Sequence, residues 1–179
     1  LQCMQHNLHK SKVVTNELNQ WLSGLKGRTG IALVQEPNNN KGKIANLSKN
    51  LNVFLGDKDK VIITTTGINS WKLNQFCNTD QVTITTKTEN NTIIVFSSIY
   101  MPFDSLEAPP SRLMTDLVEF CANKRWELII GADANSHHIG WGSSDNNTRG
   151  ENLFDYIVST NLQICNIGGE PTFENIIRQ

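Results

Sequence analysis

The 179-residue sequence has no apolar run near the ~20 residues that a membrane-spanning helix requires, and no signal peptide opens it. Charged residues are scarce, at 18% of the chain, with a net charge of -1. Lys and Arg form only small groups, whereas DNA-binding proteins normally carry basic clusters. We therefore expect no membrane partner. Any polyanionic ligand must be held by a few local contacts, with a shallow dependence of affinity on salt.

Cysteine is also sparse. Cys3, Cys77, Cys121 and Cys165 lie far apart and form no Cys-x-x-Cys motif. Three of them lie within apolar segments, which is typical of small core residues rather than metal ligands or disulfides. We expect Cys121 and Cys165 to belong to the core of a protein that acts in a reducing compartment.

The chain has no initiator Met and no internal repeat. It begins directly in a strand-like segment, and Gln179 follows neither a cap nor a terminal helix. The length and the 38% hydrophobic composition suit one buried core. We therefore expect a single domain over residues 1–179, excerpted from a longer polypeptide and incomplete at its C-terminus.

Apolar periodicity predicts strands interleaved with helices. Helical spacing of apolar residues predicts one helix from an N-cap at Ser11 to Leu25, one that starts at Pro109-Pro110-Ser111, and one over about 150–161. Strands are predicted at residues 1–7, 31–34, 53–55, 61–65, 81–87, 92–100, 128–130 and 162–165. The Leu128-Ile129-Ile130 strand is expected to be buried. This order favours an α/β (α+β) fold with mixed sheets faced by helices.

Polar side chains follow four of these strands. Asn7, Glu36, Tyr100, Asp133 and Asn135 each lie at or just beyond a predicted strand end. Taken singly, each has an ordinary explanation: an Asn in a turn, a solvated Glu before Pro, a Tyr that packs with its hydroxyl in water. Taken together around one crevice, they offer the oxygen ligands that Mg²⁺ prefers, and Mg²⁺ can assist attack on a phosphodiester.

Several motifs in this order resemble the endonuclease domain of non-LTR (LINE-type, R1-like and Jockey-like) retrotransposons, in the endonuclease/exonuclease/phosphatase superfamily. The resemblance covers essentially the whole chain. It rests on Asn7, Gln35-Glu36-Pro37, Ser98-Ile99-Tyr100-Met101-Pro102, Gly131-Ala132-Asp133-Ala134-Asn135-Ser136-His137-His138 with Trp141-Gly142, Arg149-Gly150, and Glu170-Pro171-Thr172-Phe173. It implies a DNase I-like four-layer α/β sandwich, two mixed sheets packed face to face with helices outside, with the last strands missing.

The resemblance also implies roles for individual residues. Glu36 would be the principal ligand of Mg²⁺, for which Mn²⁺ could substitute, and Asn7 would contact the metal or the phosphate. Asp133 would orient or activate the attacking water, Asn135 would hold the scissile phosphate, and Tyr100 would hydrogen-bond it as charge develops. The resemblance further implies DNA or site contacts for Thr172, His137 and His138; of the two histidines, we expect one to make such contacts and the other to be structural.

Family members continue with a strand bearing an Asp and a later Ser-Asp-His segment, and this chain ends before both. We therefore expect the isolated chain to be inactive or impaired, since a proton-transfer group contributes ~10²–10⁴-fold to a rate. The absent strands would also leave an open sheet edge.

The resemblance implies an enzyme that nicks one strand of double-stranded DNA and leaves a 3′-hydroxyl. A reverse transcriptase domain in the same polypeptide would extend that end, which implies action in the nucleus. Two alternatives remain. One is a non-catalytic DNA-docking module or decayed fragment that lacks the general-base His. The other is a small-molecule phosphoesterase of the same fold.

Overall fold

The computed structural model describes residues 1–40, 43–44, 47–48, 50–57, 60–64 and 67–166. The chain divides into two compact units. The first comprises Leu1–Met101 with Arg112–Asp133, and the second comprises Pro102–Ser111 with Ala134–Gln179. Both four-stranded sheets of the fold belong to the first unit.

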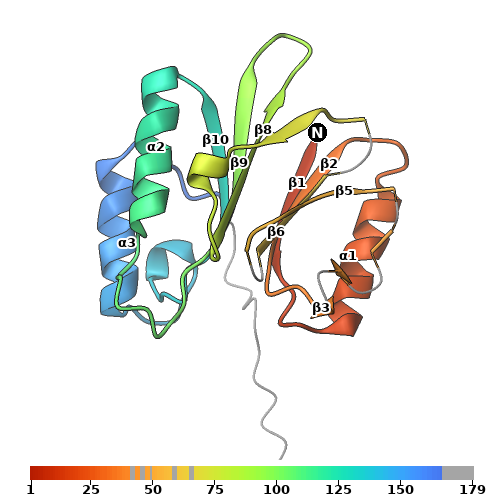
Figure 1. Ribbon diagram of the computed structural model, residues 1–179. Helices are drawn as coiled ribbons and strands as arrows, with labels where there is room; N and C mark the ends of the chain where they lie inside the picture. Colours follow the sequence, from red (N-terminus) through yellow and green to blue (C-terminus); the bar gives the residue numbers. More distant parts are fainter. Residues whose placement is uncertain (41–42, 45–46, 49, 58–59, 65–66, 167–179) are drawn as a thin grey trace, which may run out of the picture. The chain divides into compact units, whose positions relative to one another are not determined.

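Each sheet of the first unit combines one parallel pair with antiparallel pairs (Figure 1). The first sheet has the order β1-β2-β6-β5, with β1 parallel to β2. The second has the order β10-β9-β8-β7, with β10 parallel to β9. The strands are β1 (Gln2–Asn7), β2 (Gly30–Gln35), β5 (Asn52–Leu55), β6 (Lys60–Thr64), β7 (Ser70–Lys72), β8 (Gln81–Lys87), β9 (Ile93–Tyr100) and β10 (Glu127–Asp133), with a small ladder of β3 (Asn39–Asn40) and β4 (Lys43–Ile44).

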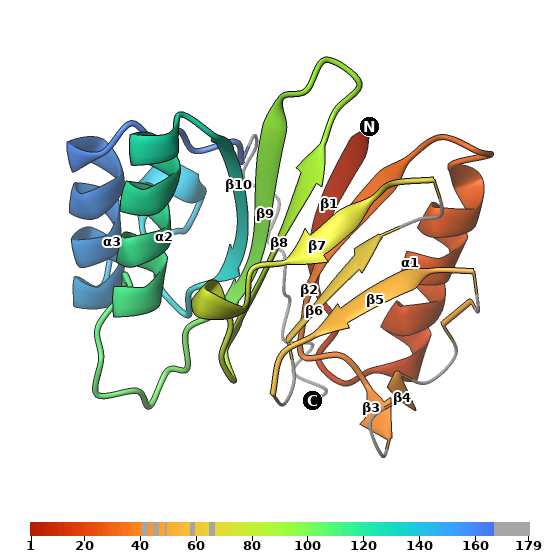
Figure 2. The ribbon, with the colours of Figure 1, turned by 45° about the horizontal axis from the view of Figure 1, so that its top comes forward.

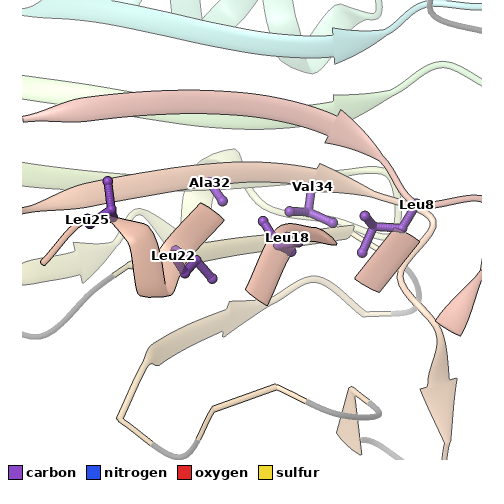
Figure 3. Close-up of a cluster of buried hydrophobic side chains, with 6 residues drawn as sticks. All are labelled: Leu8, Leu18, Leu22, Leu25, Ala32 and Val34. Atoms are coloured by element: carbon purple, nitrogen blue, oxygen red, sulfur yellow. The ribbon is translucent and has the colours of Figure 1, made fainter. Parts of the chain in front are cut away.

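Helix α1 (Lys12–Gly24) covers the outer face of the first sheet. The hydroxyl of Ser11 accepts a hydrogen bond from the N–H of Val14, which confirms the predicted N-cap. The leucines of α1 pack on the even-numbered residues of β2, because side chains alternate between the faces of a strand. The resulting cluster consists of Leu8, Leu18, Leu22, Leu25, Ala32 and Val34 (Figure 3).

The odd-numbered residues of β2 point the other way, toward the second sheet. Ile31 and Leu33 pack there against Val82, Ile84 and Phe96, and all five side chains are 0–1% exposed. Burying one such side chain contributes ~1.5–3 kcal/mol, so this layer holds the two sheets face to face.

Helix α2 (Arg112–Lys124) closes the other side of the second sheet. Its Leu117 and Cys121 pack on Val95 of β9 and on Phe76, which lies in the short 3-10 helix η1 (Asn74–Phe76). Helix, sheet, sheet and helix therefore succeed one another through the first unit (Figure 2). The predicted four-layer α/β sandwich with two mixed sheets is confirmed.

Strand β10 is less buried than its apolar sequence predicts. Ile129 is 39% exposed, although the run Leu128-Ile129-Ile130 was expected to be fully covered. Among the described strands, β10 pairs only with β9 and β1 pairs only with β2. One edge of each strand is thus left without a described neighbour, and the prediction of a fully buried strand was wrong for that reason.

The second unit contains helix α3 (Thr148–Ser159). The side-chain oxygen of Asn147 accepts a hydrogen bond from the N–H of Gly150 and caps this helix, so it begins two residues before the predicted start. The predicted strand over 162–165 is not formed. Leu162 and Ile164 alternate in exposure with Gln163 and Cys165, but the segment pairs with no described strand. Cys165 is exposed and is not a core residue as predicted.

The described helices are short. Helices α1 and α2 have 13 residues and α3 has 12, against the ~20 that a bilayer requires. None of the helices in the described ranges is long and apolar enough to cross a membrane.

Candidate nuclease site

Four of the predicted site residues lie at the carboxyl ends of β1, β2, β9 and β10. Asn7 and Gln35 face each other in the parallel β1–β2 pair, and Glu36 follows directly. Tyr100 and Asp133 are partners at the end of the parallel β9–β10 pair. Parallel strands bring their carboxyl ends to one edge of a sheet, where ligands of α/β proteins usually bind. The predicted gathering of these residues therefore follows from the strand directions.

A direct hydrogen bond joins the two sheets at this edge. Nδ2 of Asn7 donates to Oδ2 of Asp133 over 2.5 Å. The other end of the same amide is also engaged, because Oδ1 of Asn7 accepts from the backbone N–H of His9 over 2.8 Å. Asn7 thus holds the half-buried Asp133 carboxylate in one orientation while its own amide is fixed by the chain that follows β1.

Glu36 lies beside the same turn. Its Oε2 is 3.4 Å from Nδ1 of His9, and its side chain is 22% exposed. The backbone N–H of Lys10 donates to the carbonyl of Glu36 over 2.7 Å, and Nδ2 of Asn38 donates to the carbonyl of Lys10. Two loops, one after β1 and one after β2, are therefore tied together around one carboxylate that remains accessible to water.

The backbone of both loops is strained. His9, Lys10 and Glu36 have φ values of 45°, 55° and 47°, in the left-handed region that costs side-chain-bearing residues ~1–2 kcal/mol each. Such conformations persist only where surrounding contacts enforce them, and they cluster at functional sites. Asn135, at φ 46°, shows the same feature in the second unit.

Tyr100 is half-buried at the end of β9. Its N–H donates to the carbonyl of Asp80, and the N–H of Met101 donates to the carbonyl of Asp133 over 2.8 Å. The backbone of Asp133 is thus held on one side by β9, while its carboxylate is held by Asn7. Asp133 is fixed both in position and in orientation.

Asn135 belongs to the second unit, where Arg149 holds its backbone. Nε of Arg149 donates to the carbonyl of Asn135 over 3.1 Å, and Nη2 donates to the carbonyl of Ala134 over 3.2 Å. The Arg149-Gly150 pair of the sequence motif therefore supports the chain that follows Asp133.

The two adjacent histidines, His137 and His138, have different environments. The ring of His138 is 8% exposed, accepts a hydrogen bond from the N–H of Gly140, and stacks on Phe154 at a centroid distance of 4.0 Å. The side chain of His137 is 59% exposed, and its Nδ1 lies 3.0 Å from Oδ1 of Asp145. His138 is thus a packing residue of its loop, whereas the ring of His137 is accessible.

Two glycines allow this loop to fold so tightly. A Cβ on Gly140 would lie 2.7 Å from the ring of Phe154, and a Cβ on Gly150 would collide with the carbonyl oxygen of His137. The N–H of Ile139 donates to Oδ1 of Asn146 over 2.9 Å. The motif from His137 to Gly142 therefore forms a compact, hydrogen-bonded loop rather than an extended one.

Thr172, the remaining predicted site residue, lies outside the described residues. Sequence reasoning missed His9 beside Glu36, and it missed the polar groups beneath the site. Within the described part of the chain, no three or more His, Cys, Asp or Glu side chains gather as they would around a metal ion. The donors at the site edge are one accessible carboxylate, one further carboxylate and an amide.

The architecture of the first unit and the strand-end residues define the DNase I-like class of endonuclease folds. The structure is similar to the endonuclease domain of TRAS1, a telomere-specific non-LTR retrotransposon, with a TM-score of 0.77 and 26% sequence identity. This similarity covers 96% of the chain and 76% of the TRAS1 domain.

The sequence gives a matching result. A family model described as endonuclease-reverse transcriptase matches residues 94–177, the segment that includes Tyr100, Asp133 and Asn135. No curated protein sequence matches the chain. The family model and the structural similarity confirm the resemblance to non-LTR retrotransposon endonuclease domains, and this fold supports a nuclease role.

Proposed function

We propose that this chain is a Mg²⁺-dependent endonuclease that hydrolyses one phosphodiester bond of double-stranded DNA and leaves a 3′-hydroxyl. The observation that carries the proposal is the bond between Asn7 and Asp133 beside the accessible carboxylate of Glu36. A fixed carboxylate and an accessible carboxylate at one edge suit the activation of water and the binding of a cation, respectively. The similarity to the TRAS1 domain supports DNA as the substrate.

The donor set fits Mg²⁺ better than a softer metal. Glu36 and Asn7 would hold the ion through oxygen atoms, and Mg²⁺ commonly takes only one or two protein carboxylates and keeps several waters. A zinc-like site would need a closed set of Cys and His ligands, and none exists within the described ranges. When bound, Mg²⁺ would polarise the phosphoryl oxygen and stabilise charge on the leaving oxygen. Mn²⁺, which accepts the same ligands, could replace it.

Side chains of the protein would have separate roles in the reaction. Asp133, held by Asn7, would orient the attacking water and accept its proton. Tyr100 would donate a hydrogen bond to the phosphate as negative charge grows on it. Asn135 would hold the scissile phosphate from the segment that Arg149 supports. Correct placement of reacting groups alone contributes several orders of magnitude to a rate.

Binding of the duplex would also use accessible polar groups outside this edge. His137 is the accessible histidine of its loop, so we assign the DNA contact to His137 and a structural role to His138. We keep Thr172 as a further backbone contact. The 3′-hydroxyl would prime a reverse transcriptase domain of the same polypeptide in the nucleus.

A substrate comparison tests this proposal. The chain, and a version that includes any downstream coding sequence of its gene, would be incubated with supercoiled plasmid and with a small phosphomonoester, in Mg²⁺ and in EDTA. We expect the longer version to convert plasmid to open circle in Mg²⁺ but not in EDTA, with little phosphomonoester hydrolysis. Preferential phosphomonoester hydrolysis would favour the phosphoesterase alternative. DNA binding without nicking by either folded protein would favour the docking module or decayed fragment.

A further inference from the structure

A buried polar network lies directly beneath the candidate site, where two facing sheets usually meet through apolar side chains. Its centre is Gln35, which is 0% exposed. Nε2 of Gln35 donates to Oγ of Ser98 over 2.9 Å and to the carbonyl of Gly131 over 3.0 Å. Oε1 of Gln35 accepts from Nε2 of Gln5 over 2.6 Å. One amide therefore links four strands, two from each sheet.

The partners of Gln35 have a regular relation to the site. Gln5, Ser98 and Gly131 each precede a site residue by two positions: Asn7, Tyr100 and Asp133. Residues two apart in a strand lie on the same face and ~6.6 Å apart along it. Gln35 itself directly precedes Glu36. The partners of Gln35 thus lie one residue layer below the site, and Gln35 itself lies opposite Asn7 in the β1–β2 pair.

The sheets approach closely at this layer. A Cβ on Gly131 would lie 2.8 Å from Cγ of Gln5 and 2.8 Å from Cβ of Leu33 on the facing sheet. Glycine is therefore required at 131 by the packing. The apolar contacts of Leu33 are non-directional, whereas the bonds of Gln35 have a defined length and angle. The directional bonds between the sheets therefore fix their register: those of Gln35, the bond from Asn7 to Asp133, and the bond from Oγ of Ser98 to the carbonyl of Val34.

The strands that carry Asn7 and Asp133 need such a restraint. Among the described strands, β1 and β10 each pair along one edge only, with β2 and β9 respectively. The amide of Gln35 adds a side-chain bond to each of them: one to Gln5 of β1 within the first sheet, and one across the sheets to the carbonyl of Gly131 on β10. Without it, each strand would keep its ladder with one neighbour and the bond between Asn7 and Asp133, but it would lose its tie to the buried amide.

We propose that Gln35 is a positioning residue of the nuclease site: its buried amide sets the spacing and register of the two sheets so that Asn7 and Asp133 meet beside Glu36. This inference rests on the proposed function for its kinetic consequences. Gln35 contacts neither substrate nor metal in this role. It acts through Gln5 and Gly131 on Asn7 and Asp133, which carry the proposed chemistry.

The test uses Gln35→Met, which keeps the length of the side chain and removes both ends of the amide. Ser98→Ala is a second variant that removes one partner of Gln35 together with the bond from Oγ of Ser98 to the carbonyl of Val34, and it carries the test if Gln35→Met does not fold. Leu22→Ala is the matched control, because Leu22 belongs to α1 and is buried against the far side of the first sheet. It lowers stability without touching the network.

A positioning role predicts a split between kinetic parameters. In the nicking assay we expect Gln35→Met to lower kcat ~10–100-fold, in the range of outer-shell substitutions, while KM for DNA changes less than threefold. Ser98→Ala should lower kcat several-fold in the same way. Leu22→Ala should keep the wild-type kcat at a temperature where it is folded. Wild-type kcat in folded Gln35→Met and Ser98→Ala would overturn the inference and leave the proposed function standing.

A second readout needs neither metal nor activity. Amide hydrogen exchange of β1 and β10 should be at least tenfold faster in Gln35→Met than in the wild type, and unchanged in Leu22→Ala at β10. Equal exchange in Gln35→Met and wild type would contradict the positioning role. If the wild type fails to nick DNA, the proposed function fails, and this exchange experiment still decides the role of Gln35.

Discussion

The amide of Asn7 donates a 2.5 Å hydrogen bond to the carboxylate of Asp133, and this bond connects the carboxyl end of β1 with that of β10. The two residues are 126 positions apart in sequence. The bond holds the carboxylate of Asp133 in a single orientation. The amide of Asn7 is held in the same way, because its Oδ1 accepts a hydrogen bond from the N–H of His9. A short chain of hydrogen bonds thus runs from the turn after β1 to the residue that we propose activates water.

Replacing Asn7 tests this chain of bonds. Asn7→Ala leaves Asp133 without its orienting donor, so we expect the nicking rate to fall ~10²-fold or more, as misplacement of a reacting group does. The matched control is Asn16→Ala, because Asn16 is exposed on α1. Initial rates of plasmid relaxation measure both variants. An Asn7→Ala rate within twofold of wild type would show that Asp133 needs no orientation.

Glu36 has a left-handed backbone, which glycine would adopt with less strain, but glycine would remove the carboxylate that the proposed function needs. Glu36→Gly and Glu36→Ala both remove the carboxylate, but only glycine adopts φ 47° without strain. We expect Glu36→Gly to be more stable than Glu36→Ala by ~1 kcal/mol in urea unfolding, with nicking lost in both. Equal stability of the two variants would show that the turn relaxes when the carboxylate is removed.

Gly150 offers a test of the loop that carries His137. Gly150→Ala places a methyl group against the carbonyl oxygen of His137, so we expect a loss of stability of ~1–3 kcal/mol, as overpacking usually costs. Gly24→Ala is the control, because a Cβ at Gly24 meets no atom within 4 Å. Urea unfolding compares them. A loop that tolerates Gly150→Ala at no cost would be looser than the structure indicates.

Thiol reactivity distinguishes the buried Cys121 from the exposed Cys165. Burial raises the pKa of Cys121 from 9.0 to about 11, so its thiol stays protonated at pH 8. We expect a thiol reagent at pH 8 to modify Cys165, which is exposed, and to spare Cys121 until the protein unfolds. Cys165→Ser serves as the control that identifies the reacting residue. Rapid labelling of Cys121 in the folded protein would contradict its burial between α2 and the second sheet.

The raised pKa of Cys121 also makes the stability of the fold depend on pH. Because the folded protein holds the Cys121 proton more tightly than the unfolded chain does, this group stabilises the fold fully below pH 9. That contribution is lost as the pH rises toward about 11. Cys121→Ala should therefore show a flatter decline of stability across this alkaline range.

Much of the fold could be predicted from local patterns. The apolar run at 31–34 and the spacing of Leu18 and Leu22 require only the periods of strands and helices, and both elements form as predicted. The strand predicted over 162–165 failed because alternation does not supply a partner. Strand β7 was missed because its three residues are too few to show any period.

The site was predictable only in its residue types. Strand ends indicated Asn7 and Asp133, but nothing local to either residue indicates that they share a hydrogen bond. Gln35 was visible as part of a motif, yet its burial between sheets depends on the register of β2 against the second sheet. Long-range register is a property of packing, and local sequence does not encode it. His9 was passed over because its proximity to Glu36 results from an unusual left-handed turn.

The central claim is that Glu36 and Asp133 together make this chain a Mg²⁺-dependent nuclease. The most direct measurement is plasmid nicking by the wild type, Glu36→Ala and Asp133→Ala, in Mg²⁺ and in EDTA, with the fold of each verified by circular dichroism. The protein would include any downstream coding sequence of its gene. The account predicts open-circle product from the wild type in Mg²⁺ only, and a loss of at least ~10²-fold in either variant. Undiminished nicking by folded Glu36→Ala or Asp133→Ala, or no nicking by the folded wild type, would contradict it.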